Sequence, residues 1–395
     1  MTRSRLAIHT LIFILLAALV PAGLSHRKAD AAAQDYQQSN RLIVHEWGTF
    51  TCVAGKDGVA IEWHPLNGPS DLPEFVYDFN DLRNENGFRH GYNCFKCAPA
   101  VIRMETPVLY FYSDSETDVS VSVAFTKGKI TEWYPQARAV WSQSVDWGRF
   151  TVTPGSDAAF PAESKQSHYY AARETDAAPI RVCGEGGEQY EKFLFYRGIG
   201  NFDLPLAVTL RENRLIVKNI SADDVAPIIL FENRGGRIGY RVYHSFKRRM
   251  ERPTLDGSIE ELEREIEMML VARGLYQKEA RAMVNTWRDS WFEEGLRVFY
   301  IVPRSVADQI LPLRIEPQPA EIVRVLVGRT EIISPETEQS IEQELSTLRN
   351  SSIDDVAMKI KREHGRFAEP VLKMILEKTT DAKARTRIER LIKSS

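Results

Sequence analysis

The sequence lacks the motifs that identify nucleotide-dependent enzymes and α/β-hydrolases. It contains no phosphate-binding glycine loop, no Gly-x-Ser-x-Gly motif and no dinucleotide-binding fingerprint. Residues 184–187 include three glycines but are not followed by the Lys-Ser/Thr pair of a P-loop. The sequence therefore predicts no organic cofactor of these kinds.

An excess of positive charge is absent, and long apolar runs are scarce. The formal net charge is −3, and an acidic surface argues against a nucleic-acid partner, because the phosphate backbone requires clustered Lys and Arg. After residue 33, no apolar run approaches the roughly twenty residues that cross a bilayer as a helix. We therefore expect no nucleic-acid binding and no membrane span in the mature protein.

Residues 1–33 have the composition of a secretory signal peptide. Arg3 and Arg5 precede an apolar run at residues 11–20, and small residues follow at 29–33. A basic start, a short apolar core and an Ala-x-Ala site are typical of such peptides. We expect cleavage after residue 33, with a cut after Ala22 as the alternative, and export to the periplasm or the cell exterior.

The mature chain would be long enough to fold on its own. Removal of the signal peptide leaves 362 residues with a net charge of −6. That length suffices for two or three domains with a sizeable core. A hydrophobic content of 43% is ordinary for a globular protein.

Only four cysteines are present, an even number that predicts disulfide bonds in an exported protein. Four cysteines allow three pairings, and the sequence does not choose among them. The simplest arrangement joins Cys94 to Cys97 and leaves Cys52 and Cys183 either paired or free.

Residues 34–250 have the pattern of a β-sandwich-rich region. Short runs of Val, Ile, Tyr, Phe and Trp are separated by Gly, Pro, Asn and Asp, which predicts several short strands. Residues 119–125 alternate as a half-buried strand should. Residues 153–179 lack periodicity and predict a long loop.

Residues 251–333 predict an αα-hairpin followed by strands that complete the β body. Ser258 begins a capping box, and apolar residues then recur at helical spacing until Gly274 and again until Gly295. The predicted strands lie at 296–302 and 321–327.

Residues 334–395 predict a helical C-terminal region. Ser334 is a favourable N-cap and Pro335 a favourable first helical residue. Further helices are expected at about residues 353–364, 367–378 and 382–393. The predicted fold class is mainly β with α (α+β), with a β-sandwich-rich body, an inserted αα-hairpin and a helical C-terminal cap.

The string Val44-His-Glu-Trp-Gly-Thr-Phe-Thr51 places two titratable residues side by side. Neighbours on a strand point to opposite faces, so His45 should share a face with Trp47, and Glu46 should share one with Phe50. Gly48 predicts a local bulge. The pair is either a hydrogen-bonded part of a buried strand or part of a site.

His90, Cys94 and Cys97 provide three possible metal ligands within eight residues. Zinc favours thiolate and imidazole, and a Cys-x-x-Cys pair is half of a common site. A disulfide, a zinc or other transition-metal site, and unmodified thiols all remain open.

Carboxylates recur beside aromatic residues, as in sugar-cleaving enzymes. A glycosidase needs two carboxyl groups that face each other across the sugar, and Glu105 and Glu132 are candidates together with His45 and Glu46. Five of the seven tryptophans lie between Trp47 and Trp147. Exposed aromatics would bind sugars, whereas buried ones would fill the core.

Several strings together resemble a family of uncharacterised exported bacterial proteins. The resemblance covers most of the mature chain and is carried by residues 44–51, 104–112, 130–135, 287–295 and 325–329. It implies export and imports no activity, cofactor or site.

Three functions are compatible with the sequence, and it leaves open whether the protein is an enzyme. The first is an exported protein that binds a polysaccharide or a cell-envelope protein through its β body. The second is an extracytoplasmic glycan hydrolase that uses Glu and His side chains. The third is a metal-binding or thiol-active protein.

Overall fold

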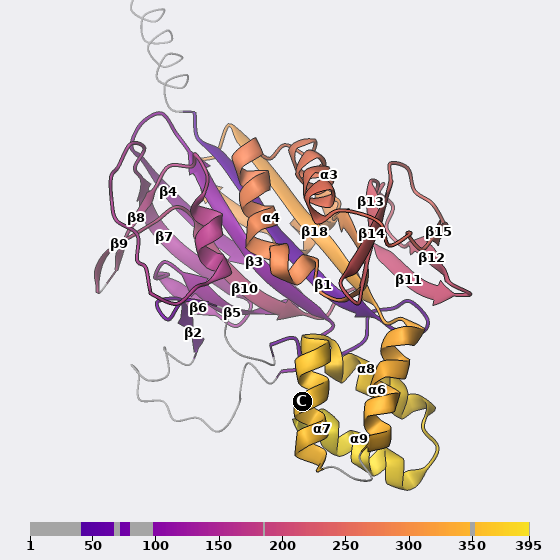
Figure 1. Cartoon of the computed structure of the whole chain (residues 1–395). Coiled ribbons are helices and arrows are strands. Elements are labelled where there is room, and N and C mark those ends of the chain that lie inside the picture. The colour runs from indigo at the N-terminus through magenta and orange to yellow at the C-terminus, as the bar shows by residue number, and fades with distance from the viewer. Residues whose placement is uncertain (1–40, 67–71, 80–97, 185, 348–351, 395) are drawn as a thin grey trace, which may run out of the picture. The chain divides into compact units, whose positions relative to one another are not determined.

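The chain is built around one large mixed sheet (Figure 1). The computed structural model describes residues 41–66, 72–79, 98–184, 186–347 and 352–394. Within them, the central sheet contains, from edge to edge, β14 (Arg237–Tyr243), β13 (Ile228–Arg234), β16 (Gly295–Ile301), β18 (Glu321–Ile332), β1 (Ile43–Ala54), β3 (Ile102–Tyr112), β10 (Leu194–Gly200), β5 (Gly128–Tyr134) and β2 (Tyr77–Asp78). Paired strands are antiparallel except β1 and β18, which run parallel.

Two smaller sheets complete the β body. In the described residues, one sheet orders β17 (Leu313–Glu316), β4 (Thr117–Ala124), β7 (Ser144–Val152), β8 (Ile180–Gly184) and β9 (Gly187–Glu191), with β6 (Ala139–Trp141) also paired to β7. We call it the six-stranded sheet. The three-stranded sheet orders β11 (Leu206–Arg211), β12 (Arg214–Asn219) and β15 (Arg249–Glu251).

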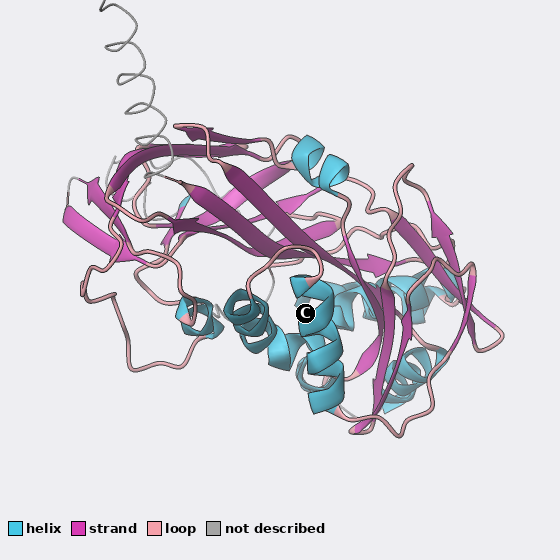
Figure 2. Cartoon of the chain, turned by 90° about the horizontal axis from the view of Figure 1, so that it is seen from above, coloured by secondary structure: helices cyan, strands magenta, loops and turns pink. Residues whose placement is uncertain are grey.

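Helices form a hairpin and a C-terminal group. The hairpin is α3 (Ile259–Val271) and α4 (Gln277–Trp291). The C-terminal group contains α6 (Pro335–Thr347), α7 (Ile353–His364), the short η3 (Gly365–Phe367), α8 (Ala368–Lys378) and α9 (Ala382–Ser394). Two short helices, η2 (His168–Arg173) and α5 (Arg304–Ile310), lie between strands in the sequence. The hairpin lies against the strands of the central sheet, and the C-terminal helices form a separate group (Figure 1, Figure 2).

The central sheet is buried on both faces. On one face, Phe50 belongs to an apolar cluster that includes Val121 of the six-stranded sheet and Val217 of the three-stranded sheet. On the other, Trp47 belongs to a cluster that includes Met283 of α4. The C-terminal helices have an apolar cluster of their own. Because both faces are covered, β1 is buried at nearly every position.

The predicted fold class, mainly β with α, is confirmed. The αα-hairpin lies where apolar spacing predicted it, the C-terminal helices lie where capping residues predicted them, and Ser258 accepts a hydrogen bond from the Glu261 N–H at 3.4 Å. The β1–β3 pairing shifts register between Trp47 and Thr49, so the irregularity expected at Gly48 is present. A Cβ at Gly48 would lie 2.9 Å from Cα of Pro107, which accounts for the glycine.

No helix in the described part of the chain is long and apolar enough to cross a membrane. Cys52 is buried and Cys183 exposed, and both are free thiols, so the option of a Cys52–Cys183 disulfide does not hold. Cys94 and Cys97, and the predicted signal peptide, lie outside the described residues.

Candidate functional site: the outer face of the six-stranded sheet

His45 lies on the helix side of the central sheet and is part of a buried hydrogen-bonded group. Its Nδ1 is 2.7 Å from Oε2 of Glu279 in α4, and the same oxygen accepts from the Tyr276 N–H at 2.8 Å. The Tyr112 hydroxyl donates to Oε1 at 2.8 Å. Burial and the Glu279 carboxylate raise the pKa of Tyr112 far above its ordinary value, so its hydroxyl remains a donor.

Glu46 points to the opposite face and neutralises a buried arginine. Its Oε2 accepts from Nε of Arg324 at 2.5 Å, and its Oε1 accepts from the Tyr196 hydroxyl at 2.6 Å. A second Arg324 nitrogen donates to Asp308 at 2.7 Å. Burial alone would lower the pKa of Arg324, but Glu46, Tyr196 and Asp308 together outweigh it and raise that pKa.

The other two carboxylate candidates are buried with partners of their own. Glu105 lies 3.3 Å from Nε of Arg103, and Glu132 accepts a hydrogen bond from the Thr131 hydroxyl. His45 and Glu46 lie on opposite faces of β1, whereas Glu105 of β3 and Glu132 of β5 flank β10 on its two sides. Arg197 of β10 is the register partner of Glu132.

The proposed metal ligands His90, Cys94 and Cys97 lie outside the described residues. Within the described ranges, no group of three or more His, Cys, Asp or Glu residues is arranged to hold a metal ion. Cys52 lies in the core, where burial raises the pKa of its thiol to about 12. A thiol with this pKa stays protonated and is a poor nucleophile.

One tryptophan differs from all the others in exposure. The structure describes all seven, and six of them are at most 3% exposed and fill the cores. Trp141, in the short strand β6, is 58% exposed. Tryptophan has a large apolar surface and is usually buried, so the surroundings of an exposed indole are of functional interest.

Strand register places Trp141 on the outer face of the six-stranded sheet. Val145 is buried in the core, so its neighbours Ser144 and Asp146 point outward. Trp141 pairs with Ser144, and Ala139 pairs with Asp146, and cross-strand partners share a face. Trp141 therefore lies about 7 Å, or two residues along the strands, from the outward-facing cross-strand row that contains Asp146.

That row forms part of a groove across three strands. The groove has a volume of about 280 Å³ and is lined by Ser120, Val121, Ser122, Arg138, Asp146, Gly148, Arg314 and Glu316. Ser122 pairs with Asp146 on one side and with Arg314 on the other. Hydroxyl, carboxylate and guanidinium groups thus line one outward-facing strip beside the exposed indole.

A bulge in β7 shapes the groove. The β4–β7 pairing skips Trp147, and the following Gly148 has a φ of +65°. A Cβ at Gly148 would also approach Cδ of Arg138 to 3.0 Å, so backbone and space both favour glycine. The Gly148 N–H donates to Asp146 at 2.7 Å, and Arg138 pairs with the same carboxylate.

Charged groups on this face are balanced in pairs. Besides Arg138 and Asp146, the outer face carries Arg314 with Glu316, and Arg149 with Asp118. The hydrogen bond and charge of Glu316 raise the pKa of Arg314. Exposed pairs of this kind add little stability, so their planar groups are available to bind a polar ligand.

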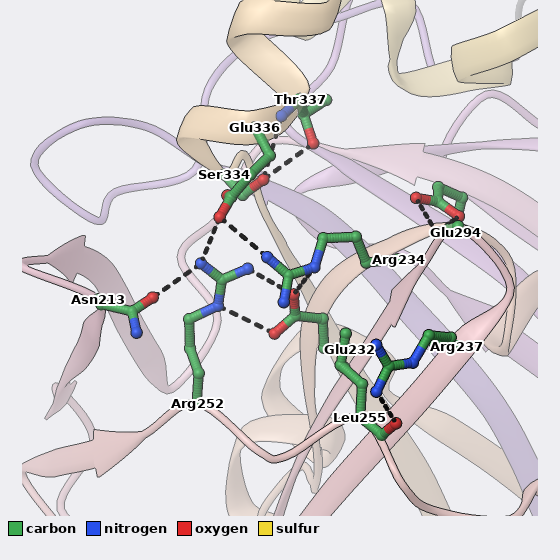
Figure 3. Close-up of polar contacts among 11 residues, drawn as sticks. Asn213, Glu232, Arg234, Arg237, Arg252, Leu255, Glu294, Ser334, Glu336 and Thr337 are labelled. Atoms are coloured by element: carbon green, nitrogen blue, oxygen red, sulfur yellow. Dashed lines mark hydrogen bonds and ion pairs between the residues drawn. The ribbon is translucent and has the colours of Figure 1, made fainter.

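A second, smaller cavity of about 140 Å³ lies where the sheet meets α6, beside a network of polar contacts (Figure 3). Glu232 accepts from Nε of Arg252 at 2.9 Å and lies 3.4 Å from Nε of Arg234. Glu336, in the first turn of α6, accepts from Arg252 at 3.0 Å and from Arg234 at 3.3 Å. Arg252 also donates to Asn213 at 2.9 Å.

This network fastens α6 to the strands. Burial would raise the pKa of Glu336, but hydrogen bonds from Arg252, Ser334 and the backbone, with the charge of Arg252, together outweigh it, so the pKa of that carboxyl lies below its ordinary value. A carboxylate in the first helical turn also interacts favourably with the helix dipole. Because these charged groups pair with one another, we interpret the network as a structural link between α6 and the strands.

Comparisons with known proteins give no family and no activity. No protein-family model and no curated protein matches the chain. Among solved structures, the chain is similar to the Fcho1 mu homology domain of Danio rerio with a bound Eps15 peptide, at 7% identity and a TM-score of 0.29. That alignment covers 74% of this chain and 97% of the other chain, and a likeness this distant supports no inference.

Sequence reasoning found the tryptophans but did not single out Trp141. The available signal was its position at the end of the short strand β6, next to the two residues that connect it to Ser144 of β7. The groove was missed altogether, since Arg138, Asp146 and Arg314 come together only through strand pairing.

Proposed function

We propose that the mature protein is an exported binding protein that recognises a polysaccharide of the cell envelope through its β body. The observation that carries this proposal is the exposed Trp141 beside the polar groove of the six-stranded sheet. The apolar face of a sugar ring can stack on an indole, while its hydroxyls bond to planar Arg and carboxylate groups. A preformed sheet face also loses little entropy on binding.

Binding is favoured over glycan hydrolysis by the placement of the acids. His45, Glu46 and Glu105 are at most 1% exposed, and Glu132 is 6% exposed. A glycosidase needs its two carboxyl groups in contact with the sugar, whereas these side chains lie inside the central sheet with partners already bound.

The test is a titration of the mature protein with purified soluble polysaccharides, followed by tryptophan fluorescence. Since the other six tryptophans are buried, we expect a blue shift that comes from Trp141. Trp141→Ala should abolish the shift and weaken binding, measured by calorimetry, about 30-fold, the loss of about 2 kcal/mol typical of an interface tryptophan. Asp146→Asn should weaken binding without abolishing it.

Phe246→Ala is the matched control, because Phe246 is an aromatic residue, 36% exposed, on the β14–β15 connection. It should leave polysaccharide affinity unchanged. Equal losses in both variants would contradict a site at Trp141. Release of reducing sugar ends from a bound polysaccharide would instead support the hydrolase.

A further inference from the structure

The connection between β14 and β15 concentrates positive charge in an otherwise acidic chain. Residues 234–252 contain seven Lys or Arg residues and one acid, whereas the whole chain has a net charge of −3. Three of the seven, Arg234, Arg237 and Arg252, contact protein groups (Figure 3).

The other four are exposed and without carboxylate partners among the described residues. They are Arg241, Lys247, Arg248 and Arg249. An exposed cation that makes no ion pair adds nothing to the stability of the fold, and four close together repel one another. Their accumulation therefore calls for a partner outside the chain.

The three-stranded sheet extends this charge over one face. Leu215 and Met250 pair and are buried in the core, so Arg249 and Ile216 point outward. The same alternation turns Lys218 and Arg211 outward on β12 and β11. The one acid on this outer face, Glu251, is paired with Arg214 at 2.8 Å.

Apolar side chains accompany the cations. Phe246 directly precedes Lys247 and is 36% exposed, and Ile220, just after β12, is 47% exposed. A main-chain hydrogen bond of 2.9 Å from Val217 to Arg248 holds the connection beside β12. We define the basic face as Arg211, Lys218, Lys247, Arg248 and Arg249 with Phe246.

We infer that the basic face docks on a membrane surface that carries anionic phospholipid headgroups. A cluster of exposed cations complements a surface of phosphates, and each Lys or Arg near such a surface adds to the attraction. Phe246 gains from the boundary between headgroups and acyl chains, where aromatic rings partition. A soluble polyanion offers no such apolar region, so the exposed ring favours the bilayer.

Co-sedimentation with vesicles tests the inference. The mature protein should bind vesicles of phosphatidylcholine with phosphatidylglycerol, and should not bind phosphatidylcholine alone, with an affinity that falls as salt is added. The variant K247Q/R248Q/R249Q should bind about 100-fold more weakly. Phe246→Trp should give an emission that shifts to the blue on the anionic vesicles and is quenched by brominated acyl chains.

The matched control is K383Q/R387Q/K393Q, which removes the same charge from exposed positions of α9 and should bind vesicles like the parent. Equal loss in both triple variants, or binding to phosphatidylcholine alone, would overturn the inference. The inference would also be overturned if the protein bound soluble polygalacturonate more tightly than anionic vesicles and brominated acyl chains did not quench the emission of the Phe246→Trp variant. Trp141→Ala should leave vesicle binding intact, so the outcome is independent of polysaccharide recognition.

Discussion

At the scale of single residues, the chain uses its conspicuous polar side chains as buried counter-ions. Glu46 and Arg324 are both almost fully buried, and the carboxylate holds the guanidinium at 2.5 Å. Such a pair adds little compared with apolar residues, but the loss of one member leaves the other charged in a dry environment. The largest effect of the pair on stability is therefore expected when one of its members is removed.

Glu46→Ala should lower the free energy of unfolding by about 3–5 kcal/mol, because Arg324 loses its buried counter-ion. Urea unfolding followed by circular dichroism measures the change. Asp118→Ala, which removes a partner of the exposed Arg149, is the control and should stay within about 1 kcal/mol of the parent. Similar losses in both variants would contradict the stated role of Glu46.

The two described cysteines should differ in reactivity. Burial raises the pKa of Cys52 to about 12, so its reactive thiolate is scarce at neutral pH, whereas Cys183 is exposed. Iodoacetamide should modify Cys183 in the native protein and Cys52 only after denaturation, as read by peptide mass spectrometry. Modification of both at the same rate under native conditions would contradict the burial of Cys52.

Part of this residue-scale arrangement could be predicted from sequence. Strand alternation placed His45 and Glu46 on opposite faces, which is what the structure has. Their partners, Glu279 and Arg324, are 234 and 278 positions away, and no local pattern encodes contacts at that distance. The site at Trp141 was not predictable for the same reason, since burial depends on which strands cover which.

At the scale of elements, the helices were well predicted because helical spacing and caps are local signals. Ser258 and Ser334 both cap helices through side-chain bonds to backbone N–H groups. The strands themselves were also visible, but their order was not. The parallel pairing of β1 with β18 and the split into three sheets depend on contacts between distant segments.

The attachment of the C-terminal helices should depend on pH. Glu336 contacts Arg252, and Glu369 in α8 lies 2.7 Å from Nδ1 of His64. Burial opposes ionisation of both acids, but their partners outweigh it and lower both pKa values. A lowered pKa in the folded state gives stability that is present above the unfolded pKa, about 4.3, and is lost as pH falls through the folded pKa.

We therefore expect residues 335–394 to lose hydrogen-exchange protection, corrected for intrinsic rates, as the pH falls below about 4.3. The central sheet should lose its protection only at a lower pH. Glu336→Gln should reduce protection of α6 at neutral pH and flatten its pH dependence. A loss of protection that is uniform over the chain would argue against a local attachment.

At the scale of the whole molecule, the net charge does not describe how charge is distributed. The net charge of −3 argued against a nucleic-acid partner, and the same chain places the exposed Lys247, Arg248 and Arg249 side by side in the sequence at the start of β15. A sum over the chain hides this separation, whereas a window of about twenty residues would have revealed it.

Export should leave a defined mature chain. When the full sequence is produced in a bacterium, the protein recovered from outside the cytoplasm should begin at Gln34, as determined by intact mass and N-terminal sequencing. A mature chain that starts after Ala22 would move the predicted cleavage site but would still support the export prediction. A full-length product retained in the cytoplasm would contradict the signal-peptide prediction.

The parallel pair at the centre of the sheet sets the order in which this chain can fold. β1 enters the folded core near the start of the described chain, yet its parallel neighbour β18 is synthesised some 278 residues later. A chain that crosses a membrane as an extended polymer therefore cannot close its central sheet until translocation is nearly complete. Under the export that the sequence predicts, this topology would delay the native state and keep the polypeptide unfolded until β18 has been made.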